Sequence, residues 1–157
     1  MEIKPYLLDT FKWNDTANKQ ILRKISELPD KAECMKFFSH LINSQYKWMA
    51  RIQQDPHSAQ MSWWDPVYVI EELEKEWTRS LNLWLDYIDA QSEKELHEEV
   101  QFTGFDAGRW AAKPKDIALQ LIYHSIHHRA QIQTLIRKQG FEPDFIDYIG
   151  TVYRKLS

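Results

Sequence analysis

The chain has 157 residues, of which 43% are apolar and 27% charged, and its formal net charge is −3. This length predicts a single domain over residues 1–157, with a core large enough to fold without disulfides. Aromatic residues make up 13% of the chain, which argues against intrinsic disorder. The slightly acidic balance argues against nucleic acid or an anionic membrane as the main partner, because both select basic proteins.

The N-terminus and the single cysteine indicate a soluble intracellular protein. The opening segment, MEIKPYLLDTFKW, is too highly charged for a signal peptide. No stretch approaches the roughly 18 consecutive apolar residues of a membrane span. Cys34 alone can form neither an internal disulfide nor a cysteine-built zinc finger. We therefore expect a cytoplasmic location.

Hydrophobic periodicity predicts four long helices, a pattern typical of an all-α four-helix bundle. The predicted helices run from about Tyr6 to Leu28, from Ala32 to Gln53, from Asp65 to about Ile88, and from Pro114 to Gln139. The third is expected to begin with Asp65 as N-cap and Pro66 in the first turn. Gly140 is expected to end the fourth in the left-handed conformation.

The connections between these helices also carry signals. Residues 55–64 read as a loop that ends in Trp63 and Trp64, and residues 100–113 as a short hairpin or an extended linker that contains Trp110. These three indoles could rim a pocket, although packing is the simpler role for each. The tail after Gly140 is expected to pack through Phe141, Phe145, Ile146 and Tyr148.

Three of the six histidines fall within five positions of the fourth predicted helix, at His124, His127 and His128. Since an α-helix turns about 100° per residue, His124 and His128 project within about 20° of the apolar residue Ile117. His127 projects toward the polar edge of the helix. The pattern predicts two inward imidazoles one turn apart and one outward imidazole.

Two buried imidazoles need partners, because an unpaired buried polar group costs about 1–3 kcal/mol. One solution is a divalent metal ion, since side chains at i and i+4 can bring two ring nitrogens to the same ion. The other is a structural role, in which each ring hydrogen-bonds to a neighbouring helix or lines a wet cavity. On the residues alone, both interpretations stay open.

Comparison with known metal-binding motifs argues against two kinds of metal site. The zinc-protease helix has Glu directly after its first His, whereas Ser125 follows His124. None of the six histidines has Glu three residues before it, which argues against a di-iron carboxylate bundle. A third ligand has three candidates. They are His97 in a charged stretch, His57 in a loop, and His40 at the edge of the apolar face of the second predicted helix.

The fragment HSIHHRAQI, from His124 to Ile132, resembles the H-x3-H-R-G-Q-I signature of the DinB/YfiT-like family. The residues HLINSQYKWMARI, which begin at His40, resemble the family's helix with a single ligand histidine. The order of hairpin, Pro114-led helix and tail also fits, so the resemblance covers essentially the whole chain. Ala130 departs from the pattern, because the family usually has Gly at that position.

The resemblance implies a four-helix bundle of up-up-down-down type that forms a homodimer. It also implies a divalent metal ion held by His40, His124 and His128. Three imidazoles favour zinc or nickel, with iron as an alternative. Characterised members of the family include S-transferases for bacterial low-molecular-weight thiols and a thiol-dependent maleylpyruvate isomerase. The expected partner is therefore a small-molecule substrate, with no nucleic acid or membrane.

Three neutral histidine ligands leave an open position on the ion, as in catalytic zinc sites. Water there would serve a hydrolase, whereas a thiol there would be deprotonated for S-transfer, the reaction that the resemblance favours. No carboxylate stands at a motif spacing for a general base, and Cys34 on a buried arc reads as a core residue. A non-catalytic metal- or ligand-binding bundle and a purely structural dimer are the alternatives.

Other polar residues are expected close to the predicted ligands. Gln120, Gln131 and Asn43 are placed to hydrogen-bond the ligand rings, although ordinary surface amides are the simpler interpretation. Arg129 projects about 100° away from His128 and is expected to pair with an acidic residue between helices.

Overall fold

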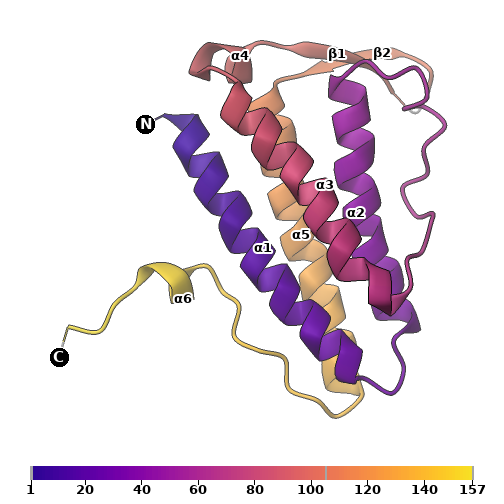
Figure 1. Ribbon diagram of the computed structural model, residues 1–157, viewed down its shortest axis with the longest axis vertical. Helices are drawn as coiled ribbons and strands as arrows, with labels where there is room; N and C mark the ends of the chain where they lie inside the picture. Colours follow the sequence, from indigo (N-terminus) through magenta and orange to yellow (C-terminus); the bar gives the residue numbers. More distant parts are fainter. Residues whose placement is uncertain (1, 105, 157) are drawn as a thin grey trace.

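The computed structural model describes residues 2–104 and 106–156, and it is mostly helical. Four long helices lie side by side: α1 (Ile3–Glu27), α2 (Ala32–Ile52), α3 (Ile70–Ala90) and α5 (Pro114–Lys138) (Figure 1). The shorter elements are α4 (Glu93–His97), β1 (Val100–Thr103), β2 (Arg109–Ala112) and α6 (Ile149–Val152). Helices α1 and α2 each pack against both α3 and α5. The two helices that carry the clustered histidines, α2 and α5, are therefore neighbours.

The helix directions correct the predicted up-up-down-down order. Residues 28–31 join α1 to α2 and reach at most about 14 Å, whereas α2 is about 31 Å long. These two helices must therefore run antiparallel. The start of α1 lies beside the residues that follow α3, because the Glu93 carboxylate accepts a hydrogen bond from the Lys4 N–H (2.7 Å). The start of α2 lies beside the end of α5, where Asp30 and Gln139 exchange two hydrogen bonds. The order is thus up-down-down-up, with α2 and α3 parallel (Figure 1).

Helix α3 begins at Ile70, so the predicted start at Asp65 and Pro66 is wrong. The segment before α3 is extended rather than helical, because its backbone groups form hydrogen bonds to side chains of α2 instead of forming a first helical turn. The Asn43 side-chain amide donates to the Pro66 carbonyl (3.1 Å), and the Tyr68 N–H donates to the Ser39 hydroxyl (2.9 Å). This attachment holds the connection between α2 and α3 alongside α2 (Figure 1).

The core is built from the inward faces of the four long helices. Helix α3 contributes Trp77 and Trp84, which are fully buried. Each indole N–H has an acceptor: the Asp15 carboxylate for Trp77 (2.9 Å) and the Gln45 carbonyl for Trp84 (3.0 Å). Buried indoles with satisfied donors give a large apolar contribution to stability without an unpaired polar group.

The hairpin predicted between the third and fourth long helices is present. Strands β1 and β2 pair antiparallel, with Val100 opposite Ala112 and Thr103 opposite Arg109. Helix α4 was not predicted, although its capping box of Ser92 and Glu95 is a readable signal. Gly140 has a φ of 84°, which confirms the left-handed end of α5.

The tail after α5 packs less than predicted. Ile146 is buried and Phe141 packs against the core, but Phe145 and Tyr148 are 64% and 47% exposed. Figure 1 shows this segment leaving the long helices, with α6 and the C-terminal end away from them. Because so few of its side chains reach the core, the tail contributes little to the packing that positions the histidines. Among the described residues, no helix is long and apolar enough to cross a membrane.

Glu93 caps α1 from outside that helix, which has no side-chain cap of its own. Its carboxylate accepts the N–H groups of Lys4 (2.7 Å) and Ile3 (3.1 Å), and the bond from Lys4 is the main cause of a lowered Glu93 pKa. A lowered native pKa adds stability above the unfolded pKa of about 4.3, and this stability is lost as the pH falls through the native value. We expect Glu93→Gln to be less stable than the wild type at pH 7. Urea denaturation at a series of pH values should show the difference shrinking below about pH 4, and a difference that stays constant would contradict this assignment.

Candidate metal centre

Three imidazoles from two helices converge on one point. His40 projects from the middle of α2, and His124 and His128 project from successive turns of α5. The Nε2 atom of His124 lies 3.0 Å from that of His40 and 2.9 Å from that of His128. The three ligand atoms all lie within 4.8 Å of one another. We call these residues the histidine triad.

The outer nitrogens of two rings are held by hydrogen bonds that fix the tautomer. His40 Nδ1 lies 2.7 Å from the Trp63 carbonyl, which can only accept, so this nitrogen carries the proton. His128 Nδ1 lies 2.6 Å from the Oε1 atom of Gln131 and donates to it. In both rings the unprotonated Nε2 therefore faces the centre of the triad, as a metal ligand requires.

This donor set fits a divalent cation. Hydrogen bonds within the triad cannot satisfy all three Nε2 atoms. A proton on His124 Nε2 can be donated to the Nε2 of His40 or to that of His128, but not to both, and the other Nε2 lone pair is left without a donor. Nitrogen ligands about 2.0–2.1 Å from one ion are separated by about 2.9–3.4 Å at octahedral or tetrahedral angles. The two shortest Nε2 separations match the lower end of that range.

Burial keeps the triad neutral, which is the metal-binding form. Desolvation is the largest cause of the lowered pKa values of all three rings. It acts most strongly on His124, whose pKa falls to about 3 with further contributions from the neighbouring rings of His128 and His40. The hydrogen bonds to the Trp63 carbonyl and to Gln131 oppose the shift at His40 and at His128.

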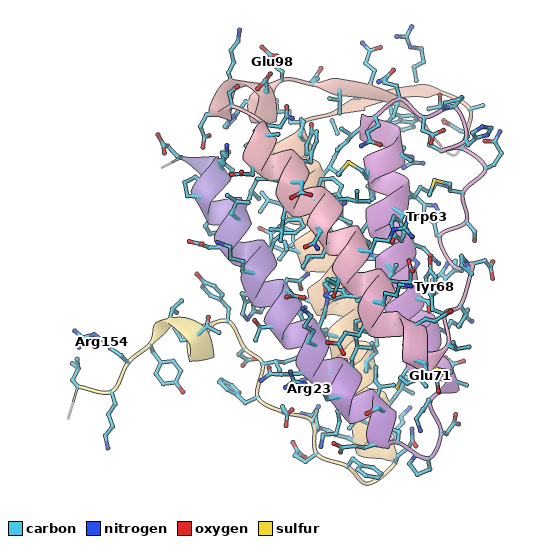
Figure 2. The ribbon with its side chains drawn as sticks, viewed as in Figure 1. Arg23, Trp63, Tyr68, Glu71, Glu98 and Arg154 are labelled. Atoms are coloured by element: carbon cyan, nitrogen blue, oxygen red, sulfur yellow. The ribbon has the colours of Figure 1, made fainter. Side chains whose placement is uncertain are left out.

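Aromatic rings and a cavity border the triad. Trp64 stacks on His40, with centroids 3.8 Å apart and planes within 9°, and Phe37 stacks on His128 at 5.4 Å. A cavity of about 250 Å³ is lined by residues of α2, of α5 and of the connection after α2. These include His40, His124 and Trp63, and Figure 2 labels Trp63 on the connection that runs beside α2. A small molecule in this cavity would lie against two of the three imidazoles.

The other three histidines do not belong to the triad, although the His127 ring lies 5.0 Å from that of His128. His127 is exposed, as its angle on the predicted helix indicated. His57 is exposed in the loop after α2. His97 is exposed at the end of α4, where its Nδ1 lies 2.7 Å from the Glu93 carbonyl. Of the three candidates for a third ligand, the structure brings only His40 to His124 and His128.

The predicted neighbours of the ligands have mixed outcomes. Gln131 hydrogen-bonds His128 as predicted, but Asn43 donates to the connection instead of to His40. Gln120 lines the cavity, and no hydrogen bond joins it to the triad within the described residues.

Trp110 lies on the hairpin, with its indole N–H donating to Asp106, and it does not line this cavity. Two ring contacts were not predicted, those of Phe37 and Trp64, because sequence spacing does not indicate which aromatic side chain meets an imidazole.

Arg129 does not pair with an acid, so that prediction is wrong. Its side chain is 3% exposed, and its guanidinium donates to the amide oxygens of Asn14 and Asn18 (2.9 Å for Asn18) and to the Ser125 hydroxyl (3.0 Å). It also lies 4.8 Å from the Trp13 ring. Burial lowers the pKa of Arg129 to about 10. The α1 residues that face α5 at this depth carry amides, and these supply acceptors without a negative charge.

Removing the Gln131 hydrogen bond should weaken metal binding. In the Gln131→Leu variant the His128 ring loses the partner that fixes its orientation. Loss of such a partner typically lowers metal affinity 10–100-fold. Competition with a chromogenic chelator measures this change. Gln133→Leu on the same helix is the matched control, and equal affinities for the two variants would show that Gln131 does not orient the ligand.

Cys34 should be chemically inert in the native protein, as expected of a core residue. The side chain is 1% exposed, and burial is the main cause that raises its pKa to about 11. Because the thiolate is the reactive form, we expect alkylation by iodoacetamide at pH 7 to be at least about 100-fold slower in the native protein than in urea. Mass spectrometry at timed intervals gives both rates, and comparable rates would place this thiol at the surface.

Comparison with known proteins adds one finding. The family model described as DinB family matches residues 4–155, nearly the whole chain. No curated protein matches the chain significantly. The match therefore concerns the family as a whole and carries no individual relative's activity.

Proposed function

The chain belongs to the DinB family, and from that premise we propose that it is a divalent-metal-dependent enzyme whose ion is held by His40, His124 and His128. The observation that carries the proposal is the convergence of three Nε2 atoms, two of them with their ring protons held on the far side. Zinc or nickel suits this all-imidazole set best, with iron as an alternative.

The reaction we propose is S-transfer from a low-molecular-weight thiol to a small electrophile. A divalent ion, when held by these neutral imidazoles, would lower the pKa of a bound thiol and so supply thiolate near pH 7. The new bond joins the thiol sulfur to carbon, the leaving group departs from that carbon, and the thiol proton passes to solvent. No carboxylate lines the triad cavity in the described part of the chain, so a reaction that needs no protein base suits the site.

The residues around the triad hold and orient the ligands. The Trp63 carbonyl and Gln131 hold the protons of His40 and His128 on Nδ1, so that the Nε2 lone pair of each neutral ring faces the centre of the triad. The stacked rings of Trp64 and Phe37 restrict rotation of the same two imidazoles. Such preorganised ligands reduce the rearrangement that substrate binding would otherwise require.

The test begins with protein purified without a histidine tag and analysed for bound metal. Metal-loaded protein is then incubated with a panel of low-molecular-weight thiols and an electrophile such as 1-chloro-2,4-dinitrobenzene. Thioether formation that needs the metal and disappears in His128→Ala would support the proposal. Ester hydrolysis without thiol transfer would indicate a hydrolase, and bound metal without turnover would indicate a binding protein.

The homodimer and the cytoplasmic location belong to the same proposal, because they rest on the family resemblance and on the sequence. Light scattering of the purified protein measures the mass directly. A mass twice the 18.9 kDa of the chain is the expected result, and a monomer at all concentrations would reject the dimer.

A further inference from the structure

A second feature of α2 is not explained by the metal centre. Lys47 and Arg51 follow His40 by two and three helical turns, and their side chains are only 6% and 5% exposed. Neither forms an ion pair with any described residue. Buried cations are normally paired with acids, because an unpaired buried charge is costly. Two buried cations on one helix face, with no acidic partner among the described residues, therefore suggest a site for a negatively charged group.

Arg51 is the less satisfied of the two. Its guanidinium lies over the rings of Trp48 (4.7 Å), Trp63 (5.0 Å) and Phe102 (5.2 Å). These contacts stabilise the charge but do not replace hydrogen bonds to its N–H groups. Its Nε is buried without a hydrogen-bond partner, and its side chain donates no hydrogen bond to any described residue. Lys47, by contrast, donates to the Met61 carbonyl and lies 4.6 Å from the Trp63 ring.

Arg51 also lines a cavity. This cavity, of about 340 Å³, lies between the end of α2, the loop after it and the hairpin. We call it the Arg51 cavity. Arg109 on β2 also lines it, and the only carboxylate among its lining residues is that of Asp55. The Asp55 carboxylate accepts the His57 N–H (2.8 Å) and forms no ion pair with Arg51. The local charge is therefore positive, and the aromatic surroundings lower the effective dielectric constant around it.

We propose that the Arg51 cavity binds an oxyanion, the carboxylate or phosphate group of a small molecule. A guanidinium presents a planar fork of donors that matches such groups, and charge-assisted bonds of this kind are among the strongest in proteins. Within the described residues Arg51 has no acidic partner and donates no hydrogen bond, and its two terminal Nη groups, which unlike Nε are not fully buried, are the donors that such a ligand would reach.

The position of the cavity connects it to the triad. Trp63 joins the two sites, since its carbonyl accepts from His40 and its ring contacts Arg51 and Lys47. His40 and Arg51 are eleven residues apart on one helix, or about 16 Å along its axis. A thiol or electrophile with an anionic group at its far end could span this distance. That last step rests on the proposed function, whereas binding of an anion at Arg51 does not.

The test is a titration of the full-length protein with inorganic phosphate and, separately, with acetate at constant ionic strength. The indole N–H resonances of Trp48 and Trp63 report on the site, because both rings contact Arg51. The titration is made in the His128→Ala background, so that the anion cannot bind to an ion at the triad. The anion that gives the tighter saturable shift identifies the preferred group.

Arg51→Met should weaken this binding about 10–100-fold, the usual effect of losing a hydrogen bond to a charged group. Arg79→Met, at an exposed arginine of α3, is the matched control and should leave the affinity unchanged. If Arg51→Met does not fold, Arg51→Lys is tested in its place, because it keeps the positive charge but loses the planar guanidinium, and it should still bind the anion more weakly than the His128→Ala protein that retains Arg51.

Two results would overturn the proposal: no saturable shift with either anion, or equal affinity in the His128→Ala protein with and without the Arg51 substitution. Neither depends on bound metal. A protein that binds anions but no metal would therefore reject the proposed function and leave the oxyanion site standing, and the reverse result would do the opposite.

Discussion

Replacing any one of His40, His124 or His128 with alanine should remove nearly all bound metal. Each variant leaves only two imidazoles around the ion, and the cost exceeds the 10–100-fold loss that is typical when a ligand's hydrogen-bond partner is removed. Elemental analysis of tag-free protein after desalting should give about one ion per chain for the wild type and a small fraction of that for each variant.

His127→Ala provides the matched control, because His127 is on the same helix but is exposed to solvent. Its metal content should equal that of the wild type. Circular dichroism must show intact helices in all four variants, so that metal loss is not a result of unfolding. Unchanged metal in any one of the three triad variants would remove that residue from the site.

Arg129→Met should destabilise the fold by about 2–5 kcal/mol. The variant leaves the buried amide oxygen of Asn14 without a hydrogen-bond donor and that of Asn18 with only the long hydrogen bond from the Ser125 hydroxyl (3.4 Å), and an unsatisfied buried group costs about 1–3 kcal/mol. The Asn14 amide nitrogen is already without a partner, so little compensation is available nearby. Urea denaturation of metal-free protein measures the change without a contribution from metal binding.

A double replacement of the acceptors distinguishes this cause from simple loss of packing. Asn14→Leu and Asn18→Leu combined with Arg129→Met remove donor and acceptors together, and should recover much of the lost stability, because replacing both partners by apolar groups can be nearly neutral. Arg137→Met at an exposed position should change stability by less than about 0.5 kcal/mol. A loss below about 1 kcal/mol for Arg129→Met would contradict the role assigned to this network.

Local sequence signals were sufficient to predict most of the long helices and two of the three triad residues. Helical periodicity placed α1, α2 and α5 to within a few residues, and the angle between successive residues separated the inward His124 and His128 from the outward His127. These predictions succeed because they depend only on geometry within one helix. His40 was different: its position at the edge of the apolar face of α2 was not a persuasive signal until the family resemblance was considered.

What the sequence could not indicate were contacts between distant segments. The start of α3 was misplaced because the side chains of Asn43 and Ser39, on another helix, hold the preceding residues extended. The partner of Arg129 was predicted as an acid because charge pairing is the general expectation, whereas this structure uses amides from α1. Helix directions were inferred from a resemblance, although the four-residue link between α1 and α2 already required an antiparallel pair.

The connection between α2 and α3 has a consequence for how the centre assembles. The carbonyl of Trp63 fixes the proton of His40 on Nδ1, and the ring of Trp64 stacks on the same imidazole. Both residues belong to a segment without regular secondary structure. Occupancy of the centre and ordering of this segment are therefore thermodynamically linked. Removing the metal with a chelator should accelerate amide deuterium uptake across residues 53–69 before it does so in the long helices. Exchange in this connection, rather than in the helices, would then report whether metal is bound.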